Sequence, residues 1–141
     1  MLRAVGLGSL SIPAIIQRID ECLIPDDREA LLNYLEMLEK KLSGWSRNTG
    51  TVLFQSSNGT IVMLKIMKRM ISDEVTLRMA VNVFDLQKRN TPVILDFLKY
   101  GGLELLIKIM DDHADDIFLM AQLPTFKTHV LGDKFAFFDW T

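Results

Sequence analysis

Residues 89–110 read RNTPVILDFLKYGGLELLIKIM, and residues 47–67 read RNTGTVLFQSSNGTIVMLKIM. Both stretches begin with Arg-Asn-Thr and end with Lys-Ile-Met. The Arg-Asn-Thr matches lie 42 residues apart, as do Leu53 and Leu95, whereas the Lys-Ile-Met matches lie 43 apart. A one-residue insertion in a loop would explain this slip. An internal period of about 40–47 residues is typical of helical solenoids and of WD40 blades, which are built from strands.

Two longer segments carry the apolar spacing of helices. In Asp26–Lys41, leucines recur every three or four positions, and Pro25 with two aspartates is typical of a helix start. In Ser72–Arg89 the apolar surface extends over most of the circumference, which predicts a helix packed between neighbours. One face of this segment comprises Val75, Met79, Val83 and Leu86. Because neither segment alternates as a strand would, we expect an all-α protein.

Further echoes link the start of the chain to these segments. SIPAIIQRI at residues 11–19 parallels GLELLIKIM at residues 102–110. LNYLEM at residues 32–37 parallels VNVFDL at residues 81–86, which lie 49 residues later. The first unit therefore carries extra residues, and KLSGWS at residues 41–46 is expected to form a surface loop with Trp45 at its tip.

The order of a short helix, a glycine break, a second helix, an acidic turn and a longer third helix resembles the armadillo repeat. Residues 90–100 resemble its first helix, GGLELLIKIM at 101–110 its second, and SDEVTLRMAVNVFDL at 72–86 its third. The resemblance covers residues 2–123 and implies a right-handed α-solenoid of about two and a half armadillo-like repeats. HEAT repeats share this two-layer arrangement and stay an alternative for individual units. The approximate units are residues 1–46, 47–89 and 90–123.

Residues 124–141 (PTFKTHVLGDKFAFFDWT) do not continue the repeat. Pro124 is expected to end the last helix after about two turns, because proline lacks the amide donor that a helix interior needs. The segment is nevertheless rich in aromatic residues, which would form an apolar patch if they were left in water. We therefore expect an irregular, aromatic-rich C-terminal tail or cap. It would cover the open end of the third unit, or pack on a second copy or another subunit.

The resemblance also implies a function. In the armadillo family an Asn near the end of each third helix binds an extended peptide on the concave face. On the sequence match this position is Glu36 in the first unit and Asp85 in the second, so recognition of a basic nuclear-localisation peptide is not implied. We expect a non-enzymatic protein–protein interaction module or scaffold that binds a protein or peptide segment. The candidate partner-binding residues are Glu29, Asn33, Glu36, Lys40, Arg78, Asn82, Asp85 and Arg89.

Two other interpretations stay open. One is a structural subunit of a larger cytoskeletal or ciliary assembly. The other is a metal-dependent module that uses the Asp111–Asp116 cluster and His113, since carboxylates bind hard cations. This cluster lacks the glycine and the distal glutamate of a calcium loop, so a solvated turn before a helix is favoured.

Composition argues against several other classes. The net charge of −2 does not predict a nucleic-acid binder. No apolar run reaches the length of about 18 residues that a membrane-spanning helix needs. Cys22, the single cysteine, lacks a neighbouring base for covalent catalysis and predicts a reducing, cytoplasmic location. The first residues are weakly similar to a mitochondrial presequence. No cofactor, catalytic residue or metal site is predicted, and a basic patch of Lys65, Lys68 and Arg69 is interpreted as a solvated helix back.

Overall fold

The computed structural model describes residues 10–22, 27–44 and 47–134. These residues form eight α-helices and no strand, so the all-α prediction is confirmed for this part of the chain. The helices are α2 (Ile12–Cys22), α3 (Arg28–Ser43), α4 (Arg47–Ser56), α5 (Gly59–Arg69), α6 (Glu74–Asp85), α7 (Thr91–Lys99), α8 (Gly102–Asp112) and α9 (Ile117–Lys134).

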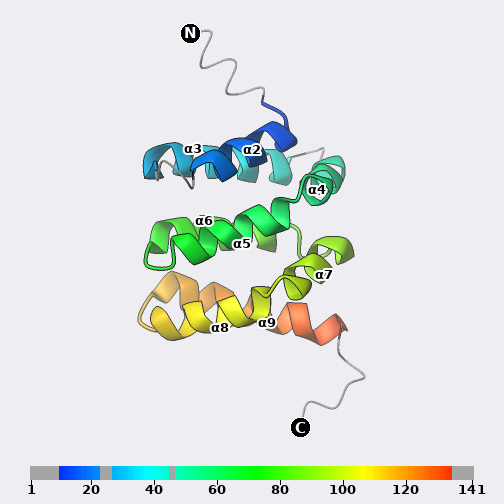
Figure 1. Ribbon diagram of the computed structural model, residues 1–141. Coiled ribbons are helices and arrows are strands. Elements are labelled where there is room, and N and C mark those ends of the chain that lie inside the picture. Colours follow the sequence, from blue (N-terminus) through cyan, green and yellow to red (C-terminus); the bar gives the residue numbers. More distant parts are fainter. Residues whose placement is uncertain (1–9, 23–26, 45–46, 135–141) are drawn as a thin grey trace.

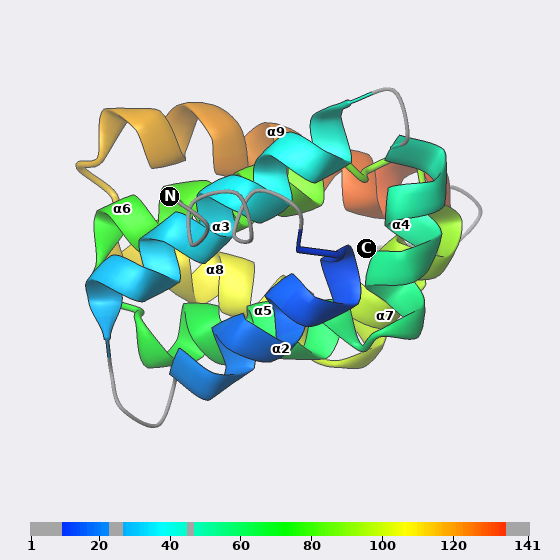
Figure 2. The ribbon, with the colours of Figure 1, turned by 90° about the horizontal axis from the view of Figure 1, so that it is seen from above.

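The helices are stacked in three tiers (Figure 1). The first tier holds α2 and α3, the second α5 and α6, and the third α8 and α9, while the short helices α4 and α7 lie to one side of the stack. Seen along the stack, α3, α6 and α9 form one layer and α2, α5 and α8 the other (Figure 2). Within the first layer α3 contacts α6, and α6 in turn contacts α9. The middle tier is therefore covered on both sides.

An aspartate begins each helix of the α3–α6–α9 layer. The carboxylates of Asp27, Asp73 and Asp116 accept hydrogen bonds from the backbone N–H three residues later, at 3.1, 3.2 and 2.9 Å. Such bonds satisfy an amide that a helix start leaves unpaired. The three caps lie 46 and 43 residues apart in the sequence. The caps therefore place the first tier 46 residues before the second. The echo between residues 32–37 and 81–86 had predicted a spacing of 49 residues for the same two tiers.

Two glycines explain why the echo persists at 43 residues. A Cβ atom added at Gly59 would lie 2.6 Å from the ring of Phe54, and one at Gly102 would lie 2.5 Å from the ring of Phe97. The short helices α4 and α7 thus each place a phenylalanine directly against the start of the helix that follows. Only a residue without a side chain fits there, because packed interiors leave no room for an added carbon.

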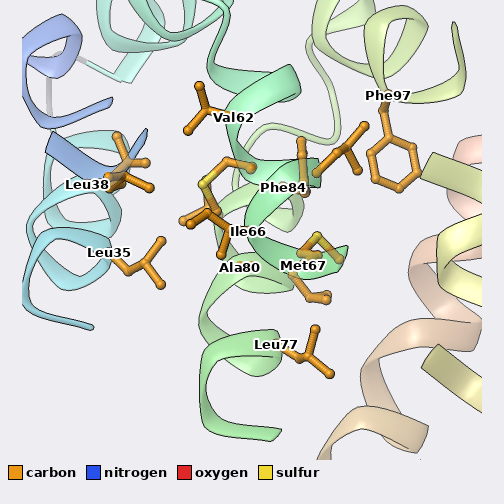
Figure 3. Close-up of a cluster of buried hydrophobic side chains, with 14 of the residues drawn as sticks. Leu35, Leu38, Val62, Ile66, Met67, Leu77, Ala80, Phe84 and Phe97 are labelled. Carbon is orange, nitrogen blue, oxygen red and sulfur yellow. The ribbon is translucent and has the colours of Figure 1, made fainter. Parts of the chain in front are cut away.

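A row of aromatic rings runs through the core. Phe84 of α6 lies edge-on to Phe54 and Phe97, with ring centroids 6.3 and 4.9 Å away. Phe126 of α9 continues the row, 5.5 Å from Phe97. Edge-to-face pairs at these distances are favourable because the positive ring edge meets the negative ring face. Figure 3 shows Phe84 and Phe97 beside the aliphatic side chains of the middle tier.

The one-residue slip in the echo is not a loop insertion. Burial follows the 43-residue register through the short helices: Thr51 and Ile94 are both buried, and Val52 and Leu95 are both exposed. Leu53 therefore does not correspond to Leu95, although both are leucines. The extra residue lies at the start of α4, which has 10 residues against the 9 of α7.

The apolar spacing of α6 predicts its burial only in part. Its buried residues are Thr76, Leu77, Ala80, Val81, Val83 and Phe84. Of the face predicted from Val75, Met79, Val83 and Leu86, only Val83 is buried, since Met79 and Leu86 are half-buried and Val75 is 41% exposed. These three lie towards the side of the helix that carries Arg78 and Asn82.

The prediction that Pro124 ends the last helix is wrong, because α9 continues from Ile117 to Lys134. A proline inside a helix costs about 3 kcal/mol through its missing hydrogen bond and its ring. Burial of each large apolar side chain contributes about 1.5–3 kcal/mol, so several together exceed that cost. The buried side chains of α9 are Leu119, Leu123, Phe126 and Val130.

The predicted loops and tail are only partly described. Lys41–Ser43 belong to α3 rather than to a loop. Residues 124–134 of the predicted irregular tail are helical. Trp45 and residues 135–141 lie outside the described residues.

Candidate functional site

Four of the candidate residues form a row on α3, which we call the α3 row. Its members are Glu29, Asn33, Glu36 and Lys40. They recur at intervals of four, three and four residues, so one side of the helix carries them all. The opposite side holds four leucines, each no more than 3% exposed. All members of the α3 row are exposed, and none makes a side-chain hydrogen bond or ion pair with another described residue.

Two of the candidates on α6, Arg78 and Asn82, form hydrogen bonds with residues of the neighbouring tiers. Nη2 of Arg78 donates to Oδ2 of Asp116 at the start of α9, at 2.9 Å. The same guanidinium lies over the ring of Phe118, 4.7 Å from its centroid. Nδ2 of Asn82 donates to the carboxylate of Glu39 on α3. Arg78 and Asn82 therefore join the middle tier to the tiers on either side.

The remaining two candidates lie at the end of α6. The Asp85 carboxylate pairs with Nζ of Lys88 at 3.6 Å. Arg89 is exposed and has no ion pair among the residues that the structure describes. Both line a cavity of about 550 Å³ between the α6–α7 turn and the start of α4, where Asn48 and Thr51 form the facing wall.

The aspartate caps also change which residues of successive tiers correspond to one another. In the 46-residue register Asp85 corresponds to Glu39, and Glu36 corresponds to Asn82. The third tier places Thr128 of α9 at the same position as Asp85. The first two tiers thus still carry an acidic residue at this position. In the first tier this residue is Glu39 rather than Glu36. Glu39 is half-buried and accepts a hydrogen bond from Asn82.

Hydrogen bonds between tiers were not predicted from the sequence. Each joins residues that lie 36–45 positions apart, close to the repeat period. They are Arg28–Asp73, Thr51–Gln87, Gln55–Asp96, Asn82–Glu39, Arg78–Asp116 and the two histidine bonds, in which Nε2 of His113 and of His129 donates to the carbonyl oxygens of Ile71 and Lys88. The sequence signal that could have found them is a polar pair separated by one period.

Two of these bonds act on the capping aspartates. The Arg28 guanidinium donates to Asp73 and holds the pKa of that carboxyl below its usual range. The pKa of Asp116 is also lowered, first by the backbone N–H of Leu119 and then by Arg78. Ionised aspartates favour a helix start, because the N-terminal end of a helix carries partial positive charge.

The Asp111–Asp116 cluster does not gather as a metal site. Among the described residues no three His, Cys, Asp or Glu side chains come together as ligands. His113 is bonded to a backbone carbonyl, and Asp112 lies 3.2 Å from Nζ of Lys108. Cys22 is buried, and burial raises the pKa of its thiol, so the reactive thiolate is disfavoured.

Comparison with other proteins leaves the site to be interpreted from its own geometry. The chain matches no protein-family model, no curated protein and no solved structure. Among the helices of the described residues, none is long and apolar enough to cross a membrane.

Proposed function

We propose that the chain is a right-handed α-solenoid of armadillo type that acts as a non-enzymatic protein-interaction module. Its binding surface is the α3 row together with Arg89. The observation that carries this proposal is the contrast between the exposed, unpaired α3 row and the engaged polar residues of α6. The stacked tiers and the 43-residue register support the armadillo resemblance, and a cytoplasmic location accords with the single buried thiol.

The spacing of the α3 row indicates what a partner segment would carry. Glu29 and Glu36 are seven residues apart, which corresponds to about 10 Å along a helix. An extended segment covers that distance in about three residues. Two basic residues spaced by three therefore match the two carboxylates, and Lys40 favours an acidic residue beyond them. Complementary charge of this kind gives specificity and speeds association.

Affinity capture with charge-reversed variants tests this proposal. The chain of residues 1–141 and its Glu29→Lys/Glu36→Lys variant are used as baits against the same cell extract. A matched control, Glu21→Lys/Asp111→Lys, makes the same change in charge on the other layer, where both residues are exposed. We expect a partner that the wild type and the control retain and that the α3 variant loses. Equal capture by all three baits would contradict the proposal.

A structural subunit of a larger assembly is the second candidate function. Three exposed apolar side chains near the starts of α6 and α9 favour it: Val75, Ile117 and Phe118 are 41%, 80% and 67% exposed. Val75 and Phe118 occupy equivalent positions in successive tiers, 43 residues apart. Light scattering of the purified chain tests self-assembly, since a mass above 16.1 kDa would require a second copy.

A further inference from the structure

The third tier is the last in the described part of the chain, so no described helix covers its outer face (Figure 1). Burial identifies the residues of this face, because positions that the next tier covers are buried in the first two tiers but not in the third. Ile16 of α2 and Leu64 of α5 are each 3% exposed, whereas Ile107, their counterpart on α8, is 49% exposed. We call this set the third-tier face, and its members are Leu103, Ile107, Met110, Met120, Pro124 and Lys127.

The α3–α6–α9 layer shows the same pattern of burial. On α3 and α6 the equivalent positions hold apolar side chains that are at most 3% exposed. On α9 they hold Met120, Pro124 and Lys127, which are half-buried. In the first two tiers these positions are covered by helices of the tier that follows, since α3 contacts α6 and α6 contacts α9. Inside this molecule, such a face is therefore covered by helices.

The outer face of the first tier is built differently. Ile66 of α5 and Ile109 of α8 are both buried, and the same position on α2 is Arg18. Arg18 is exposed, and its Nη1 donates to the hydroxyl of Tyr34 on α3 at 3.4 Å. Terminal units of stacked repeat proteins need a polar outer face to stay soluble. Arg18 and Tyr34 contribute polar groups to the outer face of the first tier, whereas the third-tier face is apolar at every position except Lys127.

Lys127 is the one charged residue of the third-tier face. It occupies the position that the buried Leu38 and Phe84 occupy in the first two tiers. Lys127 is half-buried and makes no hydrogen bond or ion pair with another described residue. Because the face contains no acidic residue, nothing on it compensates this ammonium group. Covering an unpaired charge costs free energy, so a partner that covers the face has to place a carboxylate against Nζ of Lys127.

We propose that the third-tier face docks an amphipathic helix of a partner protein. The apolar stripe of this helix, with large side chains every three or four residues, packs on Ile107, Met110 and Met120. An Asp or Glu beside the stripe pairs with Lys127 and fixes the register of the helix on the face. The face belongs to the third tier and the α3 row to the first, so the two partners would not compete.

Selection from a library of amphipathic helical peptides tests this proposal. The peptides have about 18 residues, or roughly five helical turns. They share a stripe of leucines, vary between Glu, Gln and Lys beside it, and are selected by phage display on the chain of residues 1–141. Enriched peptides are measured by fluorescence anisotropy against the face variants Ile107→Gln and Lys127→Glu. The matched controls are Val52→Gln, at a side chain that is 60% exposed, and Lys68→Glu, at an exposed lysine.

The enriched peptides should carry Glu beside the stripe. Each face variant should weaken their binding about tenfold or more, and the controls should leave it unchanged. Replacing that Glu by Lys in the peptide should lower affinity for the wild type and restore it for Lys127→Glu. Methyl resonances of Ile107, Met110 and Met120 should shift when the peptide is added to the wild type, which tests the site even if a face variant fails to fold. The peptides should bind Glu29→Lys/Glu36→Lys normally, so this result is distinct from that of the α3 row.

Several outcomes would overturn the proposal. They are no enrichment, equal binding by the face variants and the controls, and methyl shifts confined to α3. A mass above 16.1 kDa for the purified chain that Ile107→Gln returns to that of the monomer would assign the face to a second copy instead. Peptide binding that appears only after residues 135–141 are removed would assign it to that segment of the chain.

Discussion

The helices α3 and α6 occupy equivalent positions in successive tiers, yet their polar side chains are used differently. Glu36 of α3 is exposed and unpaired among the described residues, whereas Asn82, its counterpart 46 residues later, donates to Glu39. The reason is position in the stack: α6 lies between α3 and α9, whereas α6 is the one described helix of this layer that lies beside α3. Asn82 of the middle tier therefore contributes to cohesion between tiers, whereas Glu36 at the same position on α3 makes no such bond with a described residue.

The largest loss of stability is expected at the equivalent positions of α3 and α6 that are both buried. Phe84 of α6 is 1% exposed and Leu38, its counterpart on α3, is 0% exposed. Phe84→Ala should lower the free energy of unfolding by about 3–5 kcal/mol and Leu38→Ala by about 2–5 kcal/mol. Phe118→Ala is the control, since this ring is 67% exposed, and it should cost no more than about 1 kcal/mol. Urea unfolding measures all three, and a Phe84 variant as stable as the control would contradict the packed middle tier.

A smaller loss is expected from a single added carbon. Gly102→Ala places a Cβ against the ring of Phe97, and overpacking of this kind typically costs about 1–3 kcal/mol. Gly132→Ala is the matched control, because nothing lies within 4 Å of its Cβ position. Gly132 is inside α9, so alanine should stabilise the protein by up to about 1 kcal/mol. Opposite shifts in the thermal midpoint support the glycine–phenylalanine packing, and equal shifts would refute it.

Arg78 and Arg89 allow a direct comparison between a polar side chain that bonds to another tier and one that is exposed. Arg78→Ala removes the partner of Asp116 and the cation above Phe118. An acceptor that is left buried without its partner is destabilising. Arg89→Ala removes an exposed side chain with no ion pair and should change the free energy of unfolding by no more than about 0.5 kcal/mol. The loss from Arg78→Ala should be several times larger in the same denaturation experiment. Equal losses would mean that the bond between α6 and α9 does not contribute to stability.

The smallest effect concerns the capping aspartates in acid. Because the pKa values of Asp73 and Asp116 are lowered in the folded protein, their contribution is complete above the unfolded value of about 3.9. It is lost as the pH falls through the lower folded values. Stability should therefore decline below about pH 4, and less steeply in Asp73→Asn and Asp116→Asn, which keep a capping oxygen. Asp111→Asn, at an exposed position, should retain the wild-type slope; a common slope for all variants would contradict this assignment.

The sequence predicted what depends on one helix at a time. The spacing of leucines identified the buried side of α3, and the broad apolar surface of Ser72–Arg89 identified a helix covered on both sides. The exposure of the α3 row follows from the same spacing. These properties are local, because a period of 3.6 residues reports directly which side of a helix is apolar.

What depends on the register between helices was not predicted. The 49-residue echo paired Glu36 with Asp85, whereas the caps pair Glu36 with Asn82. Hydrogen bonds such as Asn82–Glu39 follow from that register and leave no periodic signal within one helix. The continuation of α9 through Pro124 was missed for a related reason, since the burial that offsets the proline comes from neighbouring helices.

The most direct test of the α3 row as a binding surface uses the partner that the wild-type bait captures. This partner is titrated by calorimetry into the Glu36→Lys variant and into the wild type. The thermal midpoint of this variant should match that of the wild type, because Glu36 contacts no other described side chain through a hydrogen bond or ion pair. The dissociation constant should rise about tenfold or more, and the difference should shrink at high salt. An unchanged dissociation constant in a fully folded Glu36→Lys variant would contradict the proposed function.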